Sequence, residues 1–253
     1  MLTLSISTLL GFLLTLVRVA GVFVFVPFPG LTGTLHPARV ILSLGITVAL
    51  FPQWPQVAAE PSAALLAMWI LTEATLGIGI GLAISFVSES LAMGAQVLGL
   101  QAGYAFASTI DPNTQADSTV LVIFSQIAAG LLFFATGLDR EVIRVFARSL
   151  ELYPPGAFVL SRAAGGQILV MGGMIFTTGL RLALPMITVL LMVDISLALL
   201  GRVNAQLQLL NLAFPIKMML GLAMLGWLAL LIPALYRASA NGALAAAGKL
   251  IAH

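Results

Sequence analysis

The chain has 253 residues, of which 60% are hydrophobic and only 8% are charged, with 11 basic and 9 acidic side chains. An ordinary soluble domain carries about 25% charged residues, and a soluble protein with so few charges would expose large apolar patches. The composition therefore excludes the usual cytosolic enzyme. The formal net charge is only +2, and the densest basic cluster is interleaved with acids, so no nucleic-acid partner is expected. We expect an integral membrane protein built of helices.

Six apolar segments follow one another along the chain, at residues 6–26, 40–51, 64–86, 120–136, 168–193 and 209–235. A crossing of ~30 Å of hydrocarbon takes about 20 residues, so four segments are long enough, 40–51 is short and 120–136 is marginal. Residues 91–107 should continue the third helix past Glu89. Runs this long and rich in Leu and Ala favour helices over barrel strands. The predicted fold class is all-α, with membrane-type helical hairpins in one domain over 1–253.

Polar residues, proline and glycine mark the connections between these segments. The first apolar run lacks a basic leader and is too long for a signal-peptide core, so no cleaved signal is expected. Residues 139–151 form an amphipathic pattern with Arg140, Arg144 and Arg148 on one face. The arginines of 139–162 and the basic residues of the C-terminal tail favour a cytoplasmic location, which predicts six crossings with both termini inside.

Six ionisable residues lie within or at the edge of apolar runs: Arg18, Glu73, Glu89, Arg181, Asp194 and Lys217. Such groups are costly at membrane depth and usually face a protein interior or a water cavity. A proton relay would need carboxylates close together, but Glu73 and Glu89 would lie ~24 Å apart along one helix. We therefore expect these six to form buried charge pairs between helices or contacts to partner subunits.

Glycine spacing indicates close helix packing at two places. Gly77 with Gly81, and Gly99 with Gly103, have the small-xxx-small spacing that lets helix backbones approach in apolar surroundings. The glycines at 77–81 are not a dinucleotide-binding motif, because Leu82 stands in the wrong place and no strand precedes them.

Enzyme chemistry lacks its usual groups. The chain has no cysteine and only two histidines, so we expect no catalytic site, no metal site and no cofactor. The polar loop 105–119 is the best candidate for a working element, and an ordinary solvent loop is its alternative.

Several motifs occur in an order that resembles one family. They are Arg18 and Pro27, Pro37-Ala38-Arg39, Glu73 before the glycine-rich helix, the block GLQAGYAFASTIDP at 99–112, Gly137, Ala183-Leu184-Pro185, Asp194, Arg202, Gln206, and Phe214-Pro215-Ile216-Lys217. Over nearly the whole chain this order resembles the FliR/SctT export-gate subunits of flagellar and injectisome type III protein secretion. The chain departs from many members at Leu138, where they carry histidine, and at 205–208, where they carry Pro-Gln-Leu-Asn.

The resemblance implies a non-enzymatic channel subunit in the bacterial inner membrane, at the flagellar basal body. One copy would assemble with FliP-like and FliQ-like sister subunits, served by FlhA- and FlhB-like gate proteins, into a pore for unfolded export substrates. The loop 103–119 would plug the closed channel, with Phe106, Ile110, Asp111, Pro112 and Asn113 as its effective residues. Members of the family lift their helices largely out of the bilayer, so apolar surface would cover sister subunits as well as lipid.

Three alternatives stay open: an injectisome export-gate subunit, an ion-coupled secondary transporter and an intramembrane enzyme. The sequences AQLQ at 205–208 and FPIK at 214–217 favour the flagellar over the injectisome branch. An ion-coupled secondary transporter is the alternative from a different class, motivated by Pro185 and the charges within apolar runs, but the chain lacks two halves with similar hydropathy. An intramembrane enzyme ranks last because no base is available.

Overall fold

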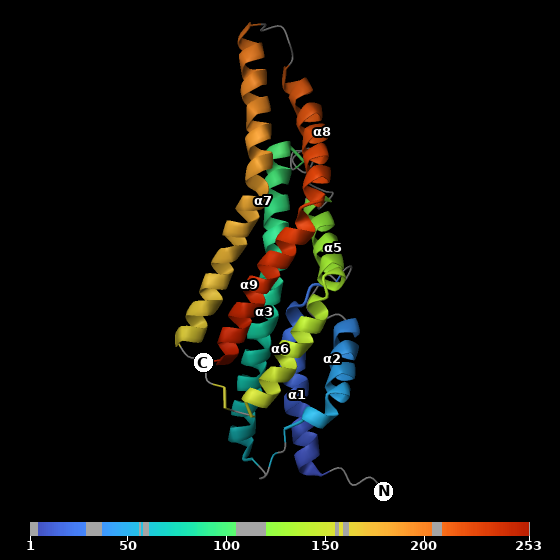
Figure 1. The fold of residues 1–253 in the computed structure, drawn as a ribbon, viewed down its shortest axis with the longest axis vertical. Helices are drawn as coiled ribbons and strands as arrows, with labels where there is room; N and C mark the ends of the chain where they lie inside the picture. The colour runs from blue at the N-terminus through green and yellow to red at the C-terminus, as the bar shows by residue number, and fades with distance from the viewer. Residues whose placement is uncertain are drawn as a thin grey trace.

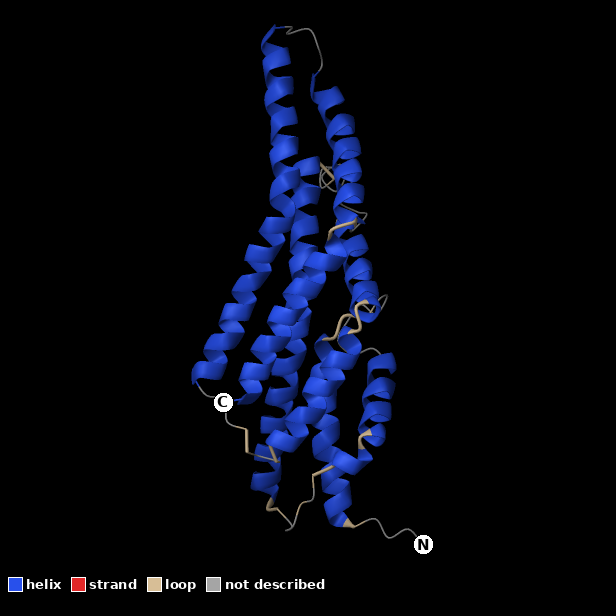
Figure 2. Cartoon of the chain, in the orientation of Figure 1, coloured by secondary structure: helices blue, strands red, loops and turns tan. Residues whose placement is uncertain are grey.

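The computed structural model describes residues 5–28, 37–55, 57, 61–104, 120–154, 157–158, 162–203 and 209–252. Within these residues all regular structure is helical (Figure 2), which confirms the all-α prediction. The elements are α1 Ile6–Phe25, α2 Pro37–Ala49, the 3-10 helix η1 Phe51–Gln53, α3 Ala63–Ala102, α5 Val120–Ala135, α6 Leu138–Leu152, α7 Arg162–Val203, α8 Leu209–Ala229 and α9 Ile232–Ala252.

The chain runs up and down the long axis of the molecule three times (Figure 1). Helices α1, α3 and α7 run in one direction, and α2, the α5–α6 pair and the α8–α9 pair return in the other. The 40-residue helix α3 is central and packs most extensively against α7 and α1, with α5 and α9 beside it. The hairpin of α7 and α8 extends beyond the carboxyl end of α3 (Figure 1).

The ends of α3 follow from local sequence. Ser62 accepts a hydrogen bond from the backbone of Leu65 at the amino end, the usual role of an N-cap serine. At the other end Gly103 has φ of 86°, in the left-handed region that favours glycine. The helix continues past Glu89, as the sequence predicted, but it ends at Ala102 and not at residue 107, because Gly103 adopts the left-handed conformation that terminates it.

Glycines allow α1 and α7 to approach α3 closely. A Cβ on Gly77 would lie 2.2 Å from the carbonyl oxygen of Arg18, and one on Gly81 would lie 2.6 Å from that of Val22. On the α7 side, a Cβ on Gly94 would lie 3.1 Å from the carbonyl oxygen of Gly179. At Gly77 and Gly81 these separations are shorter than a side chain tolerates, so larger residues there would push α1 away from α3. At Gly94 a side chain would require a small shift of α7.

Two of the returning arms are bent pairs of helices. Helices α5 and α6 meet at 68°, around Gly137 with φ of 74°, and α8 and α9 meet at 62°. The segment 209–235, expected as one helix, is thus two, because Pro233 cannot donate a backbone hydrogen bond and fits only the first turn of α9. By contrast α7 continues through Pro185 and bends near its midpoint (Figure 1).

The number of possible membrane crossings is lower than the six expected. Among the described residues, α1, α3 and residues 168–202 of α7 are each long and apolar enough to span a membrane, and each bent pair could add one more. Helix α2 has only 13 residues, a length of ~20 Å. The structure therefore allows three to five spans, because Pro37 and Pro52 confine the segment 40–51 to a short helix.

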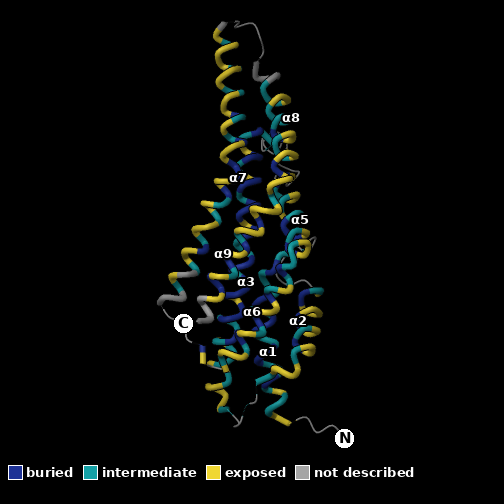
Figure 3. Tube along the Cα trace, in the orientation of Figure 1, coloured by how far each residue is buried: buried dark blue, intermediate teal, exposed yellow. Residues whose placement is uncertain are grey.

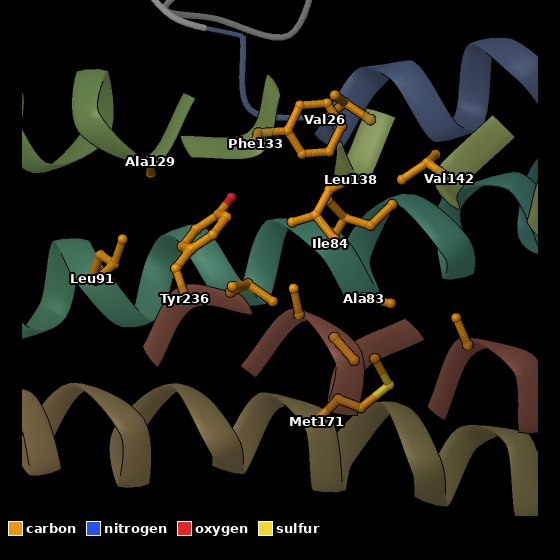
Figure 4. Packing of buried hydrophobic residues seen from close by; sticks show 14 of the residues in the cluster. Val26, Ala83, Ile84, Leu91, Ala129, Phe133, Leu138, Val142, Met171 and Tyr236 are labelled. Atoms are coloured by element: carbon orange, nitrogen blue, oxygen red, sulfur yellow. The ribbon is translucent and has the colours of Figure 1, made fainter. Parts of the chain in front are cut away.

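The core lies along α3, and the outer faces of the long hairpins are exposed (Figure 3). Figure 4 shows Tyr236 of α9 pointing across α3 toward α5, and the ring of Phe133 of α5 lying beside Val26. Helix α2 has the reverse pattern, because its buried residues are Arg39, Ser43 and Thr47 while its apolar side chains face outward.

Candidate functional site

The first group of polar residues is centred on Arg18 of α1, whose side chain is 1% exposed. Its guanidinium forms an ion pair with Glu73 of α3, through Nε to Oε2 and through Nη2 to Oε1 at 2.8 Å. Nη1 donates to the backbone oxygen of Ser149 at 2.7 Å and to its Oγ at 3.2 Å, and Nη2 also donates to the backbone oxygen of Tyr153 at 3.0 Å. The five donors of the guanidinium therefore all have acceptors.

This arrangement joins three helices that are distant in sequence. The backbone oxygens of Ser149 and Tyr153 lie at the carboxyl end of α6, where the last carbonyl groups of a helix run out of intrahelical donors. The oxygen of Ser149 also accepts from the backbone N–H of Tyr153 at 3.1 Å, so Arg18 is its second donor. A positive charge there is also favoured by the helix dipole. Arg18 thus caps α6 while Glu73 balances its charge, and the group is a buried structural tie between α1, α3 and α6.

Arg39 of α2 has the same role at the end of α1. Its Nη1 donates to the backbone oxygen of Phe23 at 2.6 Å and to that of Val24, both in the last turn of α1. Its guanidinium also lies over the ring of Phe28, 5.6 Å from the centroid. These contacts explain how the charged side chain of Arg39 can face inward on α2.

The second polar group lies at the carboxyl end of α3. Nζ of Lys217 in α8 is 2.9 Å from both carboxylate oxygens of Asp194 in α7. Nε2 of Gln101 in α3 approaches Oδ2 of the same carboxylate at 3.4 Å. The side chains of Lys217 and Asp194 are 15% and 38% exposed, so this pair is shielded from water only in part.

Two further contacts hold the same end of α3 on α8. The open face of Gly103 lies against the ring of Phe214, since a Cβ there would be 2.8 Å from Cδ1. The hydroxyl of Tyr104 donates to the backbone oxygen of Met218 at 3.1 Å, and burial raises the pKa of Tyr104. We define the α3 anchor as Gln101, Gly103, Tyr104, Asp194, Phe214 and Lys217. Residue 105 follows it directly in the chain.

The remaining residues singled out from the sequence fall in different places. Glu89 and Arg181 are exposed in the single chain, although they lie in apolar runs as Arg18 and Glu73 do. Gly99 is buried, and its oxygen accepts a hydrogen bond from the backbone of Tyr104 at 2.9 Å. Phe106, Ile110, Asp111, Pro112 and Asn113, expected to act in the loop, lie outside the described residues.

Sequence reasoning missed several contacts that the structure shows. The carbonyl acceptors at Ser149 and Tyr153 carry no side-chain pattern that could reveal them. The crossing of Gly94 and Gly179 could have been found, because Ser90–Gly94 and Gly179–Ala183 both have small-xxx-small spacing.

The chain is similar to one described protein family and to several individual relatives. The family model described as bacterial export proteins, family 1, matches residues 9–242. The chain is 33% identical over 198 residues to the flagellar biosynthetic protein FliR of Pectobacterium carotovorum, covering 77% of this chain and 76% of the relative. It is 31% identical over 192 residues to the FliR of Escherichia coli K12, covering 75% and 73%.

A relative with a different name is also similar. The surface presentation of antigens protein SpaR of Salmonella typhimurium is 27% identical over 219 residues, which cover 83% of this chain and 78% of that protein. The match over residues 9–242 includes both the Arg18–Glu73 tie and the α3 anchor. This chain therefore belongs to family 1 of the bacterial export proteins.

Proposed function

We propose that this protein is a non-enzymatic channel subunit of the flagellar type III export gate, which passes unfolded flagellar proteins across the inner membrane. Family membership supports a role in protein export. Two relatives that carry a flagellar name reach 33% and 31% identity, other flagellar relatives lie between 22% and 25%, and the surface presentation protein is at 27%. The two highest of these identities favour the flagellar system.

The exposed apolar surface is the observation that carries the proposal. Large apolar side chains on the outer faces of α7 and the α8–α9 pair are exposed in the single chain (Figure 3), including Leu169, Phe176, Met192, Leu199, Met219, Trp227 and Leu230. A soluble monomer rarely exposes apolar patches larger than a few hundred Å². Lipid and the FliP-like and FliQ-like sister subunits would cover this surface, with FlhA- and FlhB-like proteins nearby.

The α3 anchor supports a role for the loop that follows it. An ion pair, a hydrogen bond and a close glycine contact fix the point at which the chain leaves α3. A loop with a fixed attachment can occupy one position in a pore with less loss of entropy than a loop on a mobile stem. We assign closure of the channel to loop 103–119, through Phe106, Ile110, Asp111, Pro112 and Asn113.

The assembly part of the proposal is tested by co-expression with the two sister subunits. We expect a stable complex that co-purifies on a tag placed on this chain, whereas the chain expressed alone should aggregate once its apolar surface leaves the membrane. A stable, monodisperse monomer that fails to co-purify with the sister subunits would refute the assignment.

The closure part is tested by conductance of the purified complex in a planar bilayer. Replacing residues 106–116 with a Gly/Ser segment of the same length should raise ion conductance while the complex still assembles. The matched control is the same replacement at residues 29–36, a connection of 8 residues. Equal conductance of the two replacements would return the loop 105–119 to an ordinary solvent loop.

A further inference from the structure

Three ion pairs in the described residues differ in how far water reaches them. The Arg18–Glu73 pair is 1% and 3% exposed, and the Arg144–Glu141 pair within α6 is 72% and 47% exposed. The Lys217–Asp194 pair lies between these extremes, at 15% and 38%. A buried pair is a permanent tie because breaking it leaves an unpaired charge in the interior, and an exposed pair contributes little. The intermediate pair can open at a moderate cost.

The Lys217–Asp194 pair lies where its opening would affect the carboxyl end of α3. Asp194 and Lys217 lie on the two arms of the hairpin that extends beyond α3 (Figure 1). Gln101 connects the carboxylate to the last turn of α3, two residues before the capping Gly103. Nearer the middle of α3, the close contact of Gly94 with Gly179 already fixes α3 against α7. The ion pair therefore controls only the end of α3 and not the whole helix.

We propose that Asp194 and Lys217 are positioning residues for closure of the channel. Their ion pair, with Gln101, holds the carboxyl end of α3 against the α7–α8 hairpin in the closed state. Loss of the pair leaves only the contacts of Gly103 and Tyr104 with α8 at that end, which loosens it and shifts the complex toward the conducting state. The inference rests on the proposed channel function, and the experiments below separate the two.

The first experiment measures conductance of the assembled complex in a planar bilayer. Asp194→Asn keeps the shape of the side chain but removes its charge, and should raise the conductance of the closed complex about tenfold, as a modest shift between two states would. Lys217→Gln should act in the same direction. The exchanged pair, Asp194→Lys with Lys217→Asp, should return conductance toward that of the native complex.

Two matched controls come from the other ion pairs of the same chain. Glu141→Gln removes the charge of the exposed pair and should leave both conductance and assembly unchanged. Glu73→Gln breaks the buried tie and should reduce the amount of assembled complex, measured by native gel. An Asp194→Asn chain that fails to assemble as Glu73→Gln does would overturn the proposal, because the pair would then be a structural tie.

The second experiment does not depend on conductance. The chain has no cysteine, so a spin label can be placed on Leu100→Cys alone, at an exposed position next to Gln101. Electron paramagnetic resonance of the labelled complex should show higher mobility of the label with Asp194→Asn, and native mobility with the exchanged pair. Unchanged mobility with Asp194→Asn would refute the anchoring role.

The outcomes also separate the inference from the proposed function. If replacing 106–116 raises conductance and Asp194→Asn does not, the positioning role is wrong and channel closure by the loop stands. If neither change raises conductance, the proposed closure itself fails. An exchanged pair that conducts as strongly as Asp194→Asn would also refute the inference, because the pairing of charges would then not matter.

Discussion

Replacing Glu73 by glutamine is the sharpest test of the buried tie at Arg18. The change keeps one acceptor oxygen for Nη2 but places an amide NH₂ where Oε2 now accepts from Nε, so two donors face each other. The positive charge of Arg18 then has no counter-ion in a site with almost no access to water. Breaking a buried pair by removing one partner costs about 3–5 kcal/mol.

The size of this loss can be calibrated on the same guanidinium. Ser149→Ala removes the contact of Oγ with Nη1 at 3.2 Å and the hydrogen bond that Oγ donates to the backbone oxygen of Phe146 at 2.6 Å. It leaves Glu73 and the backbone acceptor of Ser149 in place, so it should cost about 1–2 kcal/mol. For a chain of this size, the Glu73→Gln loss corresponds to a melting temperature lower by about 10 °C. Replacing both partners, Arg18→Met with Glu73→Leu, should recover more than half of the loss, since no unpaired charge remains.

Melting of the full-length chain in detergent, followed by tryptophan fluorescence, gives the comparison directly. The four proteins are the native chain, Ser149→Ala, Glu73→Gln and the double variant. If Glu73→Gln melts no lower than Ser149→Ala, the ion pair does not carry the stability assigned to it. A double variant less stable than Glu73→Gln would show that the cost comes from lost packing and not from the unpaired charge.

Two glycine positions give further predictions, each with a control in the same chain. Gly77→Ala should lower the melting temperature strongly because its Cβ would lie 2.2 Å from a backbone oxygen of α1, whereas Gly79→Ala should be tolerated because a Cβ there has nothing within 4 Å; equal melting of the two would contradict the close crossing. Gly103→Ala should destabilise by more than the roughly 1 kcal/mol that a left-handed backbone alone costs, because a ring of α8 also fills the space of its Cβ. Gly137→Ala is the control, because it has the same backbone strain but nothing within 4 Å of its Cβ. Its melting temperature should therefore fall by less than that of Gly103→Ala.

The sequence predicted the helical class and the cost of charge in apolar runs, because both depend on composition and local spacing. It could not predict which charges would pair. Arg18 and Glu73 are separated by 55 positions and meet only because α1 crosses α3 at glycines. Glu89 lies in the same helix as Glu73 with the same kind of neighbours, yet it is exposed in the single chain. Helical periodicity alone does not say which face of a helix a neighbour will cover when both faces are apolar.

The α3 anchor was predicted in part. Gln101, Gly103, Asp194 and Lys217 were each noted from the sequence, as members of motifs or as costly charges. Their convergence depends on the parallel packing of α3 with α7 and on the hairpin that returns α8, neither of which leaves a local signal. The contact of Tyr104 with a backbone oxygen was missed for the same reason.

Arg39 and Arg18 donate hydrogen bonds to the last carbonyl groups of α1 and α6, so these helix ends need no donor from outside the chain. A helix terminus normally needs water or a neighbouring polar group for its last carbonyls, which limits where it can be placed. Here Arg39 and Arg18 supply the donors from within the chain. The carbonyl groups of these two termini therefore keep their donors whether the outer surface of the hairpins faces lipid or another protein.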